Sequence, residues 1–329
     1  MLNQAKQNAT EYIRQNADVF QSVSDYIWQN PELSLQEFKA TQRFCAELRN
    51  EGFTVTENLC GIPTAFCGSW GSGRPVIGIL GEYDALSGLS QVQGITHQQS
   101  IVPGGSGHGC GHNLLGAGSA AAGIALAQLV DEGLPATVVV YGTPAEETLA
   151  GKTIMIENGY FRDVDVCLAW HPLDHNDPGE VKFKAAEALT FTFHGRAAHA
   201  CNCPENGRSA LDAAELTNIG VNYLREHVDK DCYMHYCYTH GGERPNIVPD
   251  YAQLWYMVRA YTFAQMKELE ARVRRVAEGA CLMTDTTVEV KILGENHDSK
   301  LNFTLAALAH DCMEAIGAPR FTEEEKAYA

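Results

Sequence analysis

Side chains that bind metal ions or carry protons recur at the ends of the strands that this sequence predicts. They are Asp84, His108, Cys110, His112, Glu146, Glu147 and His171. Thiolate, imidazole and carboxylate groups are common ligands of divalent metal ions. Because strand ends of an open α/β sheet gather where such sheets place their chemistry, we expect these groups to converge. Two clustered divalent ions could use such mixed ligands.

Each part of this set also has a structural explanation when taken alone. The loop 108–112 could be incidental, because a buried cysteine behaves as a small hydrophobic residue and a histidine often only satisfies a backbone carbonyl. Glu146 and Glu147 could be a solvated helix start, since acidic residues favour the first helical turn. His171 could be a plain turn residue before Pro172. Their joint occurrence at successive strand ends favours the functional interpretation.

The first part of the chain alternates helical and strand-like stretches. We expect helices over 6–30, 35–51, 112–132 and 153–158, and strands over 53–56, 64–69, 75–80, 136–141 and 165–170. This alternation predicts an α/β fold with a mostly parallel sheet covered by helices on both faces. The helix over 112–132 is rich in Ala and Gly and can therefore pack closely on the sheet.

Beyond about residue 184 the pattern changes to that of an α+β unit. We expect strands over 189–194, 253–260 and 287–293, and helices over 212–225 and 263–280. They predict one antiparallel sheet with two helices on a face, and a further helix over 303–316 is expected to pack back on the first domain. We predict a catalytic domain of residues 1–185 plus 300–329. Residues 186–299 are predicted to form an inserted lid and dimerisation domain.

Composition restricts the partners and the compartment. The formal charge of −17, with only 24 Lys and Arg, argues against a nucleic-acid partner. Residues 1–20 lack the pattern of a secretory signal, and no apolar run reaches the 18 residues of a membrane span. The eleven cysteines show no regular spacing, which is typical of reduced thiols. We expect a cytoplasmic protein that binds neither nucleic acid nor membranes.

Four motifs, in order, resemble those of the peptidase M20 family of metal-dependent amidohydrolases. They lie at residues 81–86, 108–113, 143–147 and 169–172. The Cys-Gly-His form of the second motif is similar to the branch that contains aminoacylase-like and indole-acetyl-amino-acid hydrolases. Within that branch, the first motif is most similar to hydrolases of p-aminobenzoyl-glutamate. The resemblance implies a zinc-peptidase-like catalytic domain and cleavage of an N-acyl or N-aroyl amino acid, with p-aminobenzoyl-glutamate as the leading candidate.

Carried over by position, the resemblance also implies roles for single residues. Four would be ligands of two divalent ions, either Mn²⁺ or Zn²⁺: Cys110, His112, Glu147 and His171. Glu146 would be the general base, and Asp84 would orient an imidazole ligand from behind. His108 would support the loop or the ligands without binding metal.

The second domain contributes further residues by the same resemblance. His199, in the segment 195–200, would reach the active site of a partner subunit and help to hold the developing oxyanion. Asn246 and Arg259 would cradle a substrate carboxylate, a group that the planar guanidinium of arginine matches with two hydrogen bonds. Without the resemblance, His199 and Arg259 would be ordinary surface or hairpin residues. We expect a homodimer or a heterodimer with a related subunit.

The resemblance departs from the family pattern after residue 300. The last segment of family members supplies a terminal histidine ligand, and no histidine after His171 lies in such a context. We therefore expect the fifth ligand to be absent, through truncation, completion by another polypeptide, or a natural fragment with poor metal affinity. A catalytically silent subunit that acts through dimerisation is an alternative to an enzyme. A dipeptidase or carboxypeptidase of the same family is another.

Overall fold

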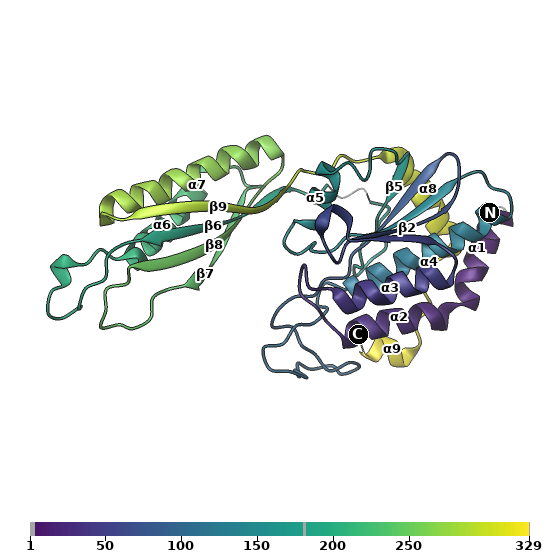
Figure 1. Cartoon of the computed structure of the whole chain (residues 1–329), viewed down its shortest axis with the longest axis horizontal. Coiled ribbons are helices and arrows are strands. Elements are labelled where there is room, and N and C mark those ends of the chain that lie inside the picture. Colours follow the sequence, from purple (N-terminus) through teal and green to yellow (C-terminus); the bar gives the residue numbers. More distant parts are fainter. Residues whose placement is uncertain (1–3, 180–181, 329) are drawn as a thin grey trace. The chain divides into compact units, whose positions relative to one another are not determined.

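The computed structural model describes residues 4–179 and 182–328. The chain divides into two compact units, Met1–Glu180 with Asn302–Ala329, and Val181–Leu301. We refer to them as unit 1 and unit 2 (Figure 1). Each has its own sheet, its own helices and its own hydrophobic core.

The sheet of unit 1 is mostly parallel, as predicted. Its strands are β1 (Thr54–Glu57), β2 (Phe66–Gly71), β3 (Val76–Gly81), β4 (Thr137–Gly142) and β5 (Val166–Leu168), in the order β1-β2-β4-β3-β5. β3 pairs in parallel with β4 and with β5, whereas β2 pairs antiparallel with β1 and with β4. β2 therefore runs against the other described strands of this sheet, and the carboxyl ends of β3, β4 and β5 lie at one edge.

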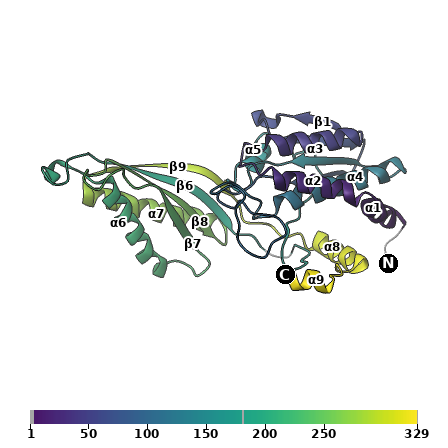
Figure 2. The same cartoon turned by 90° about the horizontal axis from the view of Figure 1, so that it is seen from below.

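Helices cover both faces of this sheet (Figures 1 and 2). One face is covered by α2 (Ala17–Gln29), α3 (Phe38–Asn50) and α4 (His112–Asp131), with α1 (Gln4–Gln15) packed on α4, and the other by α5 (Gly151–Glu157) and a short 3-10 turn η1 (Leu59–Gly61). The helices α8 (Phe303–Ile316) and α9 (Glu323–Tyr328) also belong to unit 1. Alternate residues of β4 face the two cores: Val140 packs with Ile124 of α4, and Tyr141 packs with Met155 of α5. This alternation follows from the two-residue period of a strand.

One predicted helix is two helices in the structure. The stretch expected over 6–30 breaks at Asn16, where the backbone leaves helical geometry. The side-chain amide of Asn16 donates to the carbonyl of Tyr12 at 2.9 Å. Asparagine competes in this way with the regular helical hydrogen bonds, which explains the break.

α4 is the central helix of unit 1. By length and composition alone it is apolar enough to cross a membrane, and 67% of its apolar stretch is buried. Gly116 and Gly123 let it approach the sheet, because a Cβ at Gly116 would lie 2.7 Å from the carbonyl oxygen of Glu82 and one at Gly123 would lie 2.2 Å from Val140. The first residue of the helix, His112, is thereby held against the end of β3.

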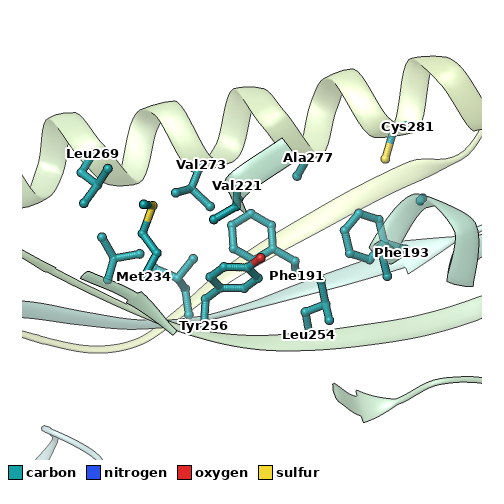
Figure 3. Packing of buried hydrophobic residues seen from close by; sticks show 14 of the residues in the cluster. Phe191, Phe193, Val221, Met234, Leu254, Tyr256, Leu269, Val273, Ala277 and Cys281 are labelled. Atoms are coloured by element: carbon teal, nitrogen blue, oxygen red, sulfur yellow. The ribbon is translucent and has the colours of Figure 1, made fainter. Parts of the chain in front are cut away.

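Unit 2 is the predicted antiparallel sheet with two helices on one face. Its strands are β6 (Ala185–His194), β7 (Tyr233–His240), β8 (Tyr251–Ala260) and β9 (Thr287–Asn296), in the order β7-β8-β6-β9. Its helices are α6 (Ala210–Leu224) and α7 (Phe263–Thr284), with short turns η2 (Pro204–Asn206) and η3 (Arg225–His227). Figure 3 shows Phe191 and Tyr256 of the sheet packed under Val273 of α7.

β7 was not predicted from the sequence. Along this strand Met234 is buried and the other side chains are exposed or half-buried. The sequence of β7 lacks the alternation of apolar and polar residues by which the neighbouring β8 was predicted, because tyrosines occur on both faces of β7.

Candidate metal centre

Asp84 connects the segments that form the candidate site. It lies just beyond the end of β3 and is 1% exposed. Its Oδ1 accepts a hydrogen bond from Nδ1 of His112 at 3.0 Å. Its Oδ2 accepts from the hydroxyl of Ser34 at 2.8 Å and from the backbone N–H of Glu147 at 3.0 Å. One carboxylate thus orients an imidazole and also anchors the loop that follows β4.

His112 is completely buried at the beginning of α4. Because Nδ1 donates to Asp84, Nε2 carries the lone pair of the neutral ring. Nε2 lies 3.2 Å from Oε2 of Glu82 and 3.8 Å from Oε2 of Glu146. Within the described part of the chain, neither Nε2 nor Oε2 of Glu82 has a hydrogen-bond partner. Two buried acceptor atoms that face each other in this way are unfavourable unless a cation or a proton lies between them.

Cys110 and His171 reach the same place from two other segments. Sγ of Cys110 lies 3.4 Å from Nε2 of His171. The ligand atoms of Cys110, His112 and His171 all lie within 4.8 Å of one another. The structure therefore brings together three of the four residues that were predicted as metal ligands.

The fourth predicted ligand, Glu147, lies beside this group. Its carboxylate is next to the thiol of Cys110 and contributes to the raised pKa of that thiol. Oε1 of Glu147 is buried and has no hydrogen-bond partner among residues 4–179 and 182–328. Glu146 belongs to a second group, in which ligand atoms of Glu82, His112 and Glu146 lie within 4.8 Å of one another.

A strained turn places Glu146 and Glu147. Ala145, just before them, has a positive φ of 57°, which is costly for a residue other than glycine. Its backbone N–H donates to Oε1 of Glu37 at 2.8 Å, and Glu37 is completely buried. Glu37 was not predicted as a site residue, because an acidic residue shortly before a helix is common in sequences. Its position shows that it fixes the turn that carries the predicted base.

The pKa values of four ionisable groups in the site are raised, so the site favours the binding of protons or cations. Burial opposes an imidazolium at His112, but the hydrogen bond to Asp84 and the charges of Asp84 and Glu82 raise its pKa to about 9. Burial raises the pKa of the Cys110 thiol to about 12, and the Glu147 carboxylate adds to this shift. Burial also raises the pKa of Glu146 and of Glu147. In the protein without metal, the Cys110 thiol and the His112 imidazole therefore hold protons that a metal ion would displace.

Asp84 behaves differently from the glutamates. Burial opposes its ionisation, yet the hydrogen bonds from His112 and from the backbone of Glu147 outweigh burial and lower its pKa. A carboxylate that stays ionised and accepts from Nδ1 fixes the tautomer and the direction of the imidazole. The geometry fits the orienting role that was predicted for Asp84.

His108 is 4% exposed, and burial lowers its pKa to about 4, so its ring is neutral. Neither ring nitrogen makes a hydrogen bond to the described residues. It stands outside both groups of candidate ligands. That His108 supports the loop and binds no metal stays a prediction.

Two of the predicted substrate-binding residues lie together in unit 2. Nδ1 of His199, an exposed residue, accepts from the backbone N–H groups of Cys201 and Asn202 at 3.2 Å. The backbone carbonyl of Asn246 accepts from the N–H of Ala200 at 3.0 Å. His199 and Asn246 are thus neighbours on the segments that lead out of β6 and into β8.

Arg259 lies elsewhere in unit 2. It is exposed near the end of β8 and pairs there with Ala186. At roughly 3.3 Å per residue along a strand, it is roughly 25 Å from the beginning of β8, where the Asn246 segment enters. Within one copy of unit 2, Asn246 and Arg259 do not meet.

Glu82 and Lys152 were not predicted as site residues. Nζ of Lys152, in the first turn of α5, forms an ion pair with Oε1 of Glu82. Glu82 and Asp84 are separated by one residue, and such residues of an extended segment point to the same side. The spacing of two residues between Glu82 and Asp84 was therefore the feature of the sequence from which Glu82 could have been predicted as a site residue.

The donor set fits divalent metal ions. It combines a thiol, two imidazoles and several carboxylates, all of them established ligands of Zn²⁺ or Mn²⁺. Such ions could bind to buried atoms that have no hydrogen-bond partner within the described residues, namely Nε2 of His112, Oε2 of Glu82 and Oε1 of Glu147.

Comparison with known proteins agrees with this geometry. Residues 78–327 match the sequence profile of Peptidase family M20/M25/M40. The chain belongs to this family. It is 42% identical over 312 residues to one of the subunits of p-aminobenzoyl-glutamate hydrolase of Escherichia coli (strain K12), covering 94% of this chain and 65% of that protein. It is 32% identical over 307 residues to Xaa-Arg dipeptidase of Mus musculus, covering 89% of this chain and 66% of that protein.

The M20 fold is also shared with solved structures. A dinuclear metal-binding peptidase of the M20 family from Bacillus subtilis superposes with a TM-score of 0.59 and 21% identity, covering 90% of this chain and 80% of that chain. This likeness confirms the fold. The present chain spans about two thirds of the length of the two curated relatives above.

Proposed function

We propose that this chain carries the metal centre of an amidohydrolase that cleaves the amide bond of an N-acyl or N-aroyl amino acid. The observation that carries the proposal is the convergence of Cys110, His112 and His171 within 4.8 Å. The leading candidate substrate is p-aminobenzoyl-glutamate. Its support is the 42% identity to a relative that is named as a hydrolase of this compound.

The cofactor of this proposal is a pair of divalent ions, Mn²⁺ or Zn²⁺. The Cys110, His112, Glu147 and His171 side chains would hold them, and the dinuclear relative from Bacillus subtilis supports the number of ions. When bound, such ions polarise a scissile carbonyl and lower the pKa of water.

Glu146 is the proposed general base. It is half-buried, and burial together with the charge of Glu82 raises its pKa, which brings it closer to the pH at which it must both accept and return a proton. It would take a proton from the attacking water and give it to the leaving amine. Asp84 would hold the His112 ring in place through the 3.0 Å hydrogen bond to Nδ1.

Unit 2 is proposed to be a lid and dimerisation domain. His199 would reach the site of a partner subunit and hold the oxyanion, and Asn246 and Arg259 would bind the substrate carboxylate. Because Asn246 and Arg259 lie near opposite ends of β8, these two residues would come from different chains. A homodimer or a heterodimer with a related subunit provides both. The second arrangement is supported by the relative from Escherichia coli, whose name makes it one subunit of its hydrolase.

We propose a cytoplasmic location for the protein. All eleven cysteines lie among the described residues, and all of them are free thiols. Free thiols at exposed positions, such as Cys201 and Cys237, suit a reducing compartment.

A dipeptidase is the second candidate, and the 32% identity to Xaa-Arg dipeptidase favours it. A panel of p-aminobenzoyl-glutamate, other N-acyl amino acids and dipeptides ending in Arg, assayed with Mn²⁺ or Zn²⁺, tests both. We expect release of glutamate from p-aminobenzoyl-glutamate to be fastest. Faster cleavage of the dipeptides would favour the dipeptidase. Tight metal binding without any hydrolysis would favour the alternative of a catalytically silent subunit.

A further inference from the structure

Glu82 belongs to the second candidate group, yet so far it has a part only through its charge, and it was not among the predicted ligands. It directly follows β3 and is 9% exposed. Oε1 is paired with Nζ of Lys152. Oε2 is buried, 3.2 Å from Nε2 of His112, and without a hydrogen-bond partner in the described residues. When Nε2 of His112 carries a proton it can donate to Oε2, but an ion bound to Nε2 displaces that proton and leaves this buried oxygen without a donor. A second cation beside Oε2 would then stabilise the site.

His112 alone cannot serve two ions. Nδ1 is engaged with Asp84, which leaves one lone pair, on Nε2, and one lone pair binds one ion. A centre with two ions therefore needs other donors for the second. Glu82 and Glu146 have carboxylate oxygens within 4.8 Å of each other and of His112, so an oxygen-rich position exists next to the one formed by Cys110 and His171.

The charges of the cluster agree with two ions. The groups that can carry a negative charge are Glu82, Asp84, Glu146, Glu147 and the thiolate of Cys110. Lys152 neutralises one of them, and two divalent ions neutralise the rest. Glu82 and Lys152 carry opposite charges, so together they leave the net charge of the cluster unchanged. Glu82 adds one oriented oxygen to the site.

We propose that Glu82 supplies a carboxylate oxygen to one of the two ions and that Lys152 is the positioning residue that fixes the direction of this carboxylate. The inference rests on the proposed function, because it assigns a further ligand to the same centre. Carboxylate oxygens suit Mn²⁺, whereas the thiol and imidazole of Cys110 and His171 suit Zn²⁺. The two positions would therefore differ in their preference for metals.

Metal titration of the full chain tests this inference without relying on activity. The protein is stripped with a chelator and titrated with Mn²⁺, while free Mn²⁺ is counted by electron paramagnetic resonance. Glu82→Gln keeps the shape of the side chain and removes its charge. We expect one of two ions to bind more weakly in this variant by at least the about 10- to 100-fold that is typical for loss of an outer-shell partner. Lys152→Met should weaken the binding of the same ion by a smaller factor. Lys152→Arg, which keeps the positive charge, should retain most of the wild-type affinity.

The matched control is Glu47→Gln. Glu47 is also a buried carboxylate of unit 1, paired with Arg43 at 3.2 Å, but it lies on α3 outside both candidate groups. It should leave both affinities unchanged. Equal losses in Glu47→Gln and Glu82→Gln would show that the effect arises from folding and would overturn the inference. If Glu82→Gln does not fold, Glu82→Asp, which keeps the charge but is one methylene shorter, should still show weaker binding of one ion.

The outcomes separate this inference from the proposed function. A wild-type chain that binds no metal contradicts the proposed function itself. A wild-type chain that binds two ions, together with folded Glu82 variants that bind both with unchanged affinity, contradicts only the role of Glu82. A wild-type chain with a single ion that does not respond to Glu82→Gln also overturns the inference.

Discussion

Sγ of Cys110 lies 3.4 Å from Nε2 of His171, although 61 residues separate them along the chain. One belongs to the loop before α4 and the other follows β5. Nε2 of His112 completes the group. Three donors from separate segments at such distances can share one metal ion, and their arrangement depends on the packing of α4 against the sheet.

Replacing the thiol should remove the softest ligand of the centre. We expect Cys110→Ser to weaken Zn²⁺ binding by more than the about 10- to 100-fold that is typical for loss of an outer-shell partner. Isothermal titration with Zn²⁺ measures this. Cys237→Ser, which changes an exposed thiol on β7, is the control and should bind Zn²⁺ like the wild type. Equal affinities of all three proteins would remove Cys110 from the ligand set.

Glu146→Gln should separate catalysis from metal binding. The amide keeps the size of the side chain but cannot accept the proton from water. We expect turnover of p-aminobenzoyl-glutamate to fall by about 100- to 10,000-fold. Metal content, determined by mass spectrometry of the purified protein, should not change. Loss of metal from this variant would instead make Glu146 a ligand.

Metal binding should strengthen as the pH rises. Without metal, the thiol of Cys110 has a pKa of about 12 and the imidazole of His112 a pKa of about 9, so both carry a proton at pH 7. Both must lose that proton to bind metal, and the apparent affinity should therefore increase between pH 6 and pH 8. Calorimetry in buffers of different ionisation enthalpy should detect release of about two protons from these groups. Binding without proton release would be inconsistent with these ligands.

Asp84→Asn should weaken metal binding indirectly, by changing the pKa of His112. The amide oxygen can still accept from Nδ1, but the negative charge that raises the pKa of His112 is lost. In the metal-free protein, NMR titration should show a lower pKa for His112 than in the wild type. Metal affinity should fall by about 10- to 100-fold. Asp311→Asn, at an exposed position of α8, should change neither quantity.

Gly116→Ala should disturb the packing that places His112. Its Cβ would lie 2.6 Å from the ring of Phe44 and 2.7 Å from the carbonyl oxygen of Glu82. We expect the free energy of unfolding, measured by urea denaturation, to fall by about 1–3 kcal/mol. Gly279→Ala, on α7 with nothing within 4 Å of the new Cβ, should instead be neutral or stabilise by up to about 1 kcal/mol. A neutral Gly116→Ala would show that the helix has room to move.

Much of the fold was predictable because its signals are local. The order of strands and helices in unit 1 follows from apolar runs and glycine-rich breaks, and the α+β pattern of unit 2 follows from alternation along β6 and β8. β7 could not be predicted in this way, because tyrosines stand on both of its faces and Met234 is its one buried residue. The break at Asn16 depends on one side-chain hydrogen bond that composition does not reveal.

The candidate site was predictable where rare side chains occur in the motifs that resemble the family. Cys110 and His112 lie where a glycine-rich loop meets α4 and His171 follows β5, and the structure brings them together. Glu82 and Glu37 were not predicted, because glutamate is common and most glutamates are solvated. Only their burial, at 9% and 0% exposure, and their bonds to Lys152 and Ala145 distinguish them from other acids.

Anomalous diffraction from crystals of the metal-loaded chain tests the central claim most directly. Data collected at the Zn and Mn absorption edges locate each ion independently of any activity. We predict anomalous peaks at the position shared by Sγ of Cys110, Nε2 of His112 and Nε2 of His171. Fully loaded crystals with no peak there, or with peaks only at other places on the protein, would contradict the account.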